Sequence, residues 1–121
     1  MDRAEMLPMA NSPARSGDDG TAAAHVETEP AFDDLLDTEA TVLVDFYAEW
    51  CGPCKVMAPT VEELAAEVEA IVAKVNVEEV PPVAARYDVK SIPAFIVFED
   101  GEATERFVGM QEKSDLRDAV E

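Results

Sequence analysis

Basic residues are scarce in this chain of 121 residues: 9 Lys and Arg stand against 27 Asp and Glu, which gives a formal net charge of −18. Nucleic acids and membranes rich in anionic lipid attract proteins through basic patches, so neither is an expected partner. Long apolar runs are also missing. No segment approaches the roughly 18 apolar residues of a membrane-spanning helix, and residues 1–20 lack the apolar core of a secretory signal. We therefore expect a cytosolic protein.

Cysteine and histidine are scarce as well, with two Cys and one His in the chain. A structural zinc site ordinarily takes four Cys or His ligands, whereas the chain offers only Cys51, Cys54 and His25. A purely structural disulfide is a second weak alternative, because closing a loop of four residues constrains the unfolded chain much less than closing a long one. Redox chemistry is the best explanation for a cysteine pair in a reducing compartment, and we expect no bound metal.

The remaining composition is that of one globular domain with a packed core, since 48% of the residues are apolar and 30% are charged. We expect residues 1–24, which contain several Pro and Gly, to be a disordered extension, and residues 25–121 to form the domain. The acids lie mostly in the domain and must coat its surface. Such a coat aids solubility, and its self-repulsion suggests adaptation to a salt-rich, halophilic cytoplasm, where the repulsion is screened.

Hydrophobic periodicity predicts an α/β fold. We expect strands at 25–27, 41–47, 71–77, 94–99 and 103–108, and helices at 30–36, 51–69, 81–87 and from 112 onward. The last two strands flank Asp100-Gly101, a strong signal for a tight hairpin. Strands that alternate with helices, followed by a hairpin and a final helix, predict a mixed sheet with helices on both faces.

The cysteines lie in the sequence Cys51-Gly52-Pro53-Cys54, where the strand at 41–47 gives way to the helix at 51–69. The first turn of a helix has free N–H groups and the positive end of the helix dipole, which favour a thiolate over a thiol at Cys51. Cys54 lies one turn further along and is shielded by the helix. We therefore expect Cys51 to be the nucleophile and Cys54 the resolving thiol.

Asp45 is an acid within the apolar strand sequence TVLVDFY, six residues before Cys51. Buried acids are rare unless they are paired or functional, and desolvation should raise the pKa of this one. We expect it to lie beneath the cysteines and to accept the proton of Cys54 through water. Lys74, in the apolar sequence IVAKVNV, is its expected partner on the adjacent strand. A purely structural ion pair is the alternative.

Three further residues are unusual where they stand. Pro93 precedes a predicted strand and cannot donate to a sheet ladder, which a cis Ile92–Pro93 peptide bond would explain. Trp50, beside Cys51, is either packed or part of an exposed apolar contact surface. Gly109 could permit close approach of two backbones.

The sequence VDFYAEWCGPCK, together with Pro59, SIPAF and FVGM, resembles the thioredoxin family over residues 25–121. The resemblance implies the thioredoxin fold, a central mixed sheet of four or five strands flanked by four helices. It implies dithiol–disulfide exchange in which Cys51 attacks and Cys54 resolves. Tyr47 and Glu78 depart from the family pattern, where Trp and Asp are common.

The resemblance also implies roles for the surrounding residues. Asp45 and Lys74 match the buried acid and lysine of the family, and Pro93 matches the cis-proline that lies against the disulfide. The remaining edge of the substrate groove would be formed by Trp50, Gly52, Pro53, Ile92 and Gly109.

We therefore expect a monomeric protein-disulfide reductase that needs no bound cofactor, acts on disulfides of client proteins and is recharged by a thioredoxin reductase. A specialised oxidant or isomerase is one alternative, although Gly-Pro between the cysteines, with no His, favours a reductant. A binding module that uses the groove at Trp50 and Ile92 without turnover is another.

Overall fold

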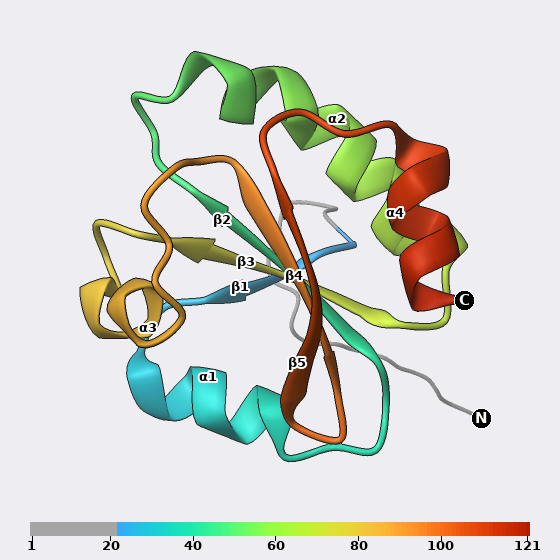
Figure 1. Ribbon diagram of the computed structural model, residues 1–121, viewed down its shortest axis with the longest axis horizontal. Helices are drawn as coiled ribbons and strands as arrows, with labels where there is room; N and C mark the ends of the chain where they lie inside the picture. Colours follow the sequence, from blue (N-terminus) through green and yellow to red (C-terminus); the bar gives the residue numbers. More distant parts are fainter. Residues whose placement is uncertain (1–21) are drawn as a thin grey trace, which may run out of the picture.

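The computed structural model describes residues 22–121, which form a five-stranded mixed sheet between two layers of helices (Figure 1). The strands are β1 (Ala24–Val26), β2 (Val42–Tyr47), β3 (Ile71–Asn76), β4 (Ala94–Glu99) and β5 (Glu102–Val108), and the helices are α1 (Glu29–Leu36), α2 (Gly52–Glu67), α3 (Pro81–Arg86) and α4 (Lys113–Val120). The strand order is β1-β3-β2-β4-β5. The predicted fold class is confirmed. None of the helices in this part of the chain is long and apolar enough to cross a membrane.

The central strand β2 is parallel to β3 and antiparallel to β4, and it is covered on both faces. Val44 and Phe46 pack with Phe32 of α1 and Val83 of α3. Leu43 points to the opposite face, where it packs in a second cluster with residues of α2 and α4. This double coverage explains why the strand is almost continuously apolar. Successive side chains alternate between faces, so the acid of this strand shares the α2 face.

The predicted elements agree with the structure to within a few residues. Asp100 (φ 54°) and Gly101 (φ 83°) both have left-handed backbone conformations and connect β4 to β5 as the sequence predicted. The predicted helix at 51–69 is shorter, because Val68 adopts an extended backbone that leads the chain toward β3. Of the predicted extension at 1–24, only residues 22–24 belong to the described part of the chain.

Candidate functional site

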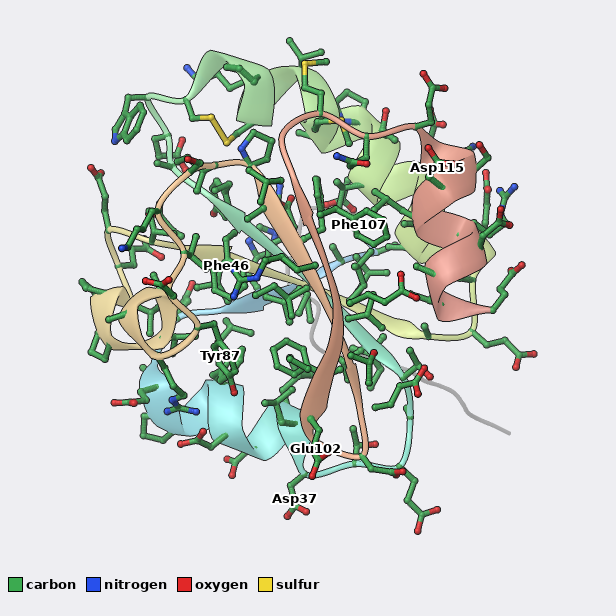
Figure 2. The ribbon with its side chains drawn as sticks, in the orientation of Figure 1. Asp37, Phe46, Tyr87, Glu102, Phe107 and Asp115 are labelled. Carbon is green, nitrogen blue, oxygen red and sulfur yellow. A yellow bond between two sulfur atoms is a disulfide. The ribbon has the colours of Figure 1, made fainter. Side chains whose placement is uncertain are left out.

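The two cysteines form a disulfide at the start of α2, shown as a yellow bond in Figure 2, with a Cα–Cα distance of 5.2 Å. Cys51 is the N-cap residue of the helix, and its Sγ accepts a hydrogen bond of 3.1 Å from the backbone N–H of Cys54. The two residues are only 4% and 6% exposed. The structure therefore places the pair at the helix terminus, where the sequence predicted it.

This position has a direct chemical consequence for the dithiol form. A thiolate at Cys51 would accept the same N–H and would lie at the positive end of a helix of 16 residues. The first turn of α2 contains no acidic residue that would oppose a negative charge. Both effects favour the thiolate, which is the nucleophilic form of cysteine.

The cis peptide bond between Ile92 and Pro93 lies in the loop before β4. Ile92 packs against the small cluster formed by Ala48 and the two cysteines. The carbonyl oxygen of Pro93 accepts a hydrogen bond of 2.8 Å from the N–H of Gly109 at the end of β5. The fold thus places Ile92 against the cysteines and joins Pro93 to Gly109, although all three residues lie far from the cysteines in the sequence.

The two predicted site glycines have different requirements. Gly109 has a φ of +90°, a backbone conformation that residues with a Cβ rarely adopt. Space is not the constraint, because a Cβ added there would meet no atom within 4 Å. The backbone conformation, and not close approach within the chain, explains this glycine. Gly52 also faces open space and lies with Pro53 in the first turn of α2.

Trp50 is 67% exposed, so the contact-surface interpretation describes it better than packing. Its Nε1–H donates a hydrogen bond of 2.7 Å to Oε2 of Glu78, which holds the indole in one orientation. In the sequence, Glu78 stands out only as a departure from a family pattern, and no pattern indicates this bond. The apolar side chains of Val108 and Met110, on either side of Gly109, are also more than half exposed.

Asp45 is buried, with 3% of its surface exposed, and its Oδ1 has no hydrogen-bond partner. Desolvation raises the pKa of this carboxyl to about 7, with the positive charge of Lys74 lowering it and the negative charge of Glu62 raising it. Glu62 lies on α2, where its Oε1 accepts the N–H groups of Ala22 (2.8 Å) and Ala23 (3.2 Å). Nothing in the sequence indicated that Glu62 belongs to this environment.

Lys74 lies directly across from Asp45 in the register of β2 and β3. Its Nζ lies 4.7 Å from the ring centroid of Tyr47, in cation–π geometry. Within residues 22–121, no ion pair of 4.0 Å or less joins Lys74 to Asp45. The partnership of these two residues is therefore electrostatic at a distance, and Lys74 makes its close contact with the aromatic ring.

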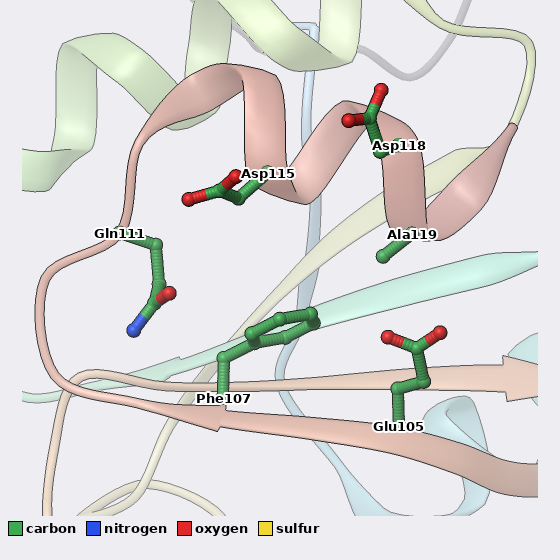
Figure 3. A pocket seen from close by; sticks show the side chains of 6 residues that line it. All are labelled: Glu105, Phe107, Gln111, Asp115, Asp118 and Ala119. Atoms are coloured by element: carbon green, nitrogen blue, oxygen red, sulfur yellow. The ribbon is translucent and has the colours of Figure 1, made fainter.

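A hollow of about 290 Å³ lies between β5 and α4 (Figure 3), and neither cysteine lines it. Its lining includes Phe107 and the carboxylates of Glu105, Asp115 and Asp118. These carboxylates do not form a cation site, since no group of three or more His, Cys, Asp or Glu in the described part of the chain could hold a metal ion.

Comparisons with known proteins point to one family. A family model described as Thioredoxin matches residues 23–121. The thioredoxin of Staphylococcus saprophyticus is 46% identical over 96 residues, which cover 78% of this chain and 91% of that protein. Among solved structures, a mutant thioredoxin from Halobacterium salinarum has a TM-score of 0.77 and 38% identity, covering 86% of this chain and 93% of that one. Fasciola hepatica thioredoxin has a TM-score of 0.74 and 36% identity, covering 80% and 95%.

Proposed function

The chain belongs to the thioredoxin family and is a dithiol–disulfide oxidoreductase, and from this premise we propose that it reduces disulfides in client proteins and is recharged by a thioredoxin reductase. The observation that carries the proposal is the cysteine pair at the N-terminus of α2, with the Cys51 sulfur accepting a helix N–H. No bound cofactor is needed for this chemistry, because the electrons reside in the two thiols.

Reduction of a client proceeds in two exchange steps. The Cys51 thiolate attacks one client sulfur, a mixed disulfide forms, and the other client sulfur leaves as a thiolate that takes a proton from solvent. Cys54 then gives its proton to Asp45 through water and attacks the Cys51 sulfur. The Cys51–Cys54 bond forms, and the second client sulfur leaves and takes up a proton. The client gains two electrons and two protons, and the reductase later returns two electrons to the cysteine pair.

We propose that clients bind along the exposed apolar surface beside the disulfide. The exposed Trp50 forms one side of this surface, and the half-buried Ile92 and Gly109 form the other, where they adjoin the buried Pro93. Gly52 and Pro53 separate the cysteines in the first turn of α2. The exposure of Trp50 and the open space at both glycines support this role, since a client backbone could approach there without displacing side chains.

The assignment of the two thiols is tested by trapping. Cys54→Ser cannot resolve the mixed disulfide and should accumulate covalent adducts with a disulfide-containing client on non-reducing gels. Cys51→Ser, the matched control, should accumulate almost none. Equal trapping by both variants would overturn the assignment. If the parent binds clients but turns over no disulfide with a dithiol donor, the chain is a binding module and the proposal fails.

The role of Asp45 is tested by the rate at which the mixed disulfide is resolved. Asp45→Asn keeps the shape of the side chain and removes the proton acceptor, and general-base effects of this kind are typically about 100-fold or more. Resolution at the parent's rate across the neutral pH range would show that Cys54 gives its proton directly to solvent.

We further propose that the acidic surface adapts the protein to a salt-rich cytoplasm, where it acts as a monomer. The bases in the described part of the chain that form ion pairs are Arg86, Lys90, Lys113 and Arg117. They leave most of the carboxylates of residues 22–121 without a cation, and a relative from Halobacterium salinarum shares the fold.

Residues 25–121 are proposed as the catalytic domain, with Ala23 and Ala24 joined to it through core packing and β1. Deleting residues 1–21 should therefore leave disulfide exchange unchanged.

A further inference from the structure

A row of polar side chains crosses three neighbouring strands beneath α2. The strand register places His25 of β1 beside Lys74 of β3, and Lys74 beside Asp45 of β2. Neighbouring strands lie about 4.8 Å apart, and residues paired in register project from the same face of a sheet. The Lys74 side chain is therefore long enough to bring its ammonium group onto the Asp45 carboxyl.

The ammonium group lies elsewhere, over the ring of Tyr47 at 4.7 Å from its centroid. Tyr47 stands two residues beyond Asp45 on β2, so both side chains are on the α2 face, and about 6.6 Å of strand separates their backbones. Lys74 consequently has two alternative partners on one face. The structure shows it on the ring, with Asp45 Oδ1 unpaired.

The choice between these partners matters for the carboxyl. The charged or titratable groups that face Asp45 are Lys74 from β3, Glu62 from α2 and Tyr47 from its own strand, with His25 beyond Lys74 on β1. An opposite charge in contact with a carboxylate stabilises its ionised form and typically lowers its pKa by about 1 to 3. A lysine held at a distance leaves desolvation as the dominant effect, which is the order found for Asp45.

We propose that Tyr47 is a positioning residue for disulfide exchange, whose ring holds the Lys74 ammonium group away from Asp45 and so keeps that carboxyl able to take up the proton of Cys54. The inference rests on the proposed role of Asp45. Tyr47 also packs against the cluster that contains both cysteines, so one side chain contacts the disulfide environment and the lysine at once.

The test follows the ionisation of Asp45 in the oxidised protein by carbon-13 NMR of its carboxyl group. Tyr47→Leu removes the ring, lets Lys74 move onto the carboxylate and should lower the pKa of Asp45 by about 1. Tyr47→Phe keeps the ring and should leave the pKa at the parent's value. The double variant Tyr47→Leu with Lys74→Met lacks both the ring and the lysine charge. The pKa of Asp45 should therefore not decrease in it.

An unchanged pKa in Tyr47→Leu would overturn the inference, as would an equal decrease in the double variant. A measurement on the parent keeps the inference testable even if the leucine variant does not fold. The Lys74 methylene protons next to Nζ should be shifted upfield by the Tyr47 ring, and their absence from the ring-current region would also overturn it.

The pH profile of mixed-disulfide resolution separates this inference from the proposed role of Asp45. In Tyr47→Leu, the acid limb of the rate profile should move to lower pH together with the pKa of Asp45. If the pKa moves and the rate profile stays, Tyr47 still positions Lys74, but Asp45 does not take the proton of Cys54. If neither moves, Tyr47 has no positioning role.

Discussion

Replacing Asp45 by Asn should stabilise the oxidised protein most above neutral pH. The carboxyl is 3% exposed and its pKa is about 7, against an ordinary value of 3.8. At a pH between these two pKa values, Asp45 has released its proton in the unfolded chain and retains it in the folded chain. The folded state therefore binds more protons, and the free energy of unfolding decreases as pH rises. Asn does not titrate, so this decrease disappears in the variant.

The size of the effect follows from the two pKa values. They differ by about 3, and each pKa unit corresponds to about 1.4 kcal/mol, so the ionised carboxyl costs at most about 4 kcal/mol of stability above pH 8 or so relative to about pH 4. The missing hydrogen bond at Oδ1 agrees with this sign, because no donor at this oxygen stabilises the ionised form.

The assay is urea unfolding of the parent and of Asp45→Asn at a series of pH values and one fixed ionic strength. The net charge of −18 makes the stability of both proteins depend on pH, so the informative quantity is the difference between them at each pH. This difference should grow in favour of the Asn variant from about pH 4 and level off above about pH 8. A difference that is constant over this range would refute the reasoning, since it would mean that folding does not change the pKa of Asp45.

Three further predictions concern Glu62, Glu78 and the acidic surface. Glu62→Gln should lower the pKa of Asp45, because it removes a nearby negative charge, whereas the control Glu63→Gln should leave that pKa unchanged. Glu62→Gln should also lower the free energy of unfolding in urea by about 1 kcal/mol, because Gln accepts weaker hydrogen bonds from the N–H groups of Ala22 and Ala23. Glu78→Ala should free the indole of Trp50 and lower the fluorescence anisotropy of this single tryptophan, and an equal decrease in Glu79→Ala would contradict the bond between them. The thermal midpoint should rise between about 0.1 and 1 M KCl, as the Debye length falls from about 10 to 3 Å, and a midpoint that does not change would leave only solubility as the reason for the acidic surface.

The sequence predicted the order of elements well because each has a strong local signal. The apolar run of β2 and the Asp100-Gly101 turn can each be recognised from a few consecutive residues. The start of α2 at the cysteines was equally legible, since Pro53 favours the first turn of a helix. Boundaries were less accurate, because the end of α2 at Glu67 is set by the direction in which the chain must leave for β3.

The partners of side chains could not be predicted in the same way. The register of two parallel strands placed Lys74 beside Asp45, as the apolar patterns suggested, but the conformation of a long side chain depends on every group within its reach. Likewise, the bond between Trp50 and Glu78 joins residues 28 positions apart, and nothing in the sequence pairs one with the other. Such contacts depend on tertiary packing, which periodicity does not describe.

The unpaired state of Asp45 bears on why an acid is found at this position. A structural ion pair would place the Lys74 ammonium group on the carboxylate, because a buried charge without a partner is destabilising. The structure has the lysine on Tyr47 and one carboxylate oxygen without a partner. An apolar side chain would fill this site at lower cost, so stability alone does not account for the acid. A carboxyl with a pKa of about 7, on the face of the sheet beneath the helix that carries both cysteines, is suited to exchanging a proton at neutral pH, which favours the catalytic explanation over the structural one.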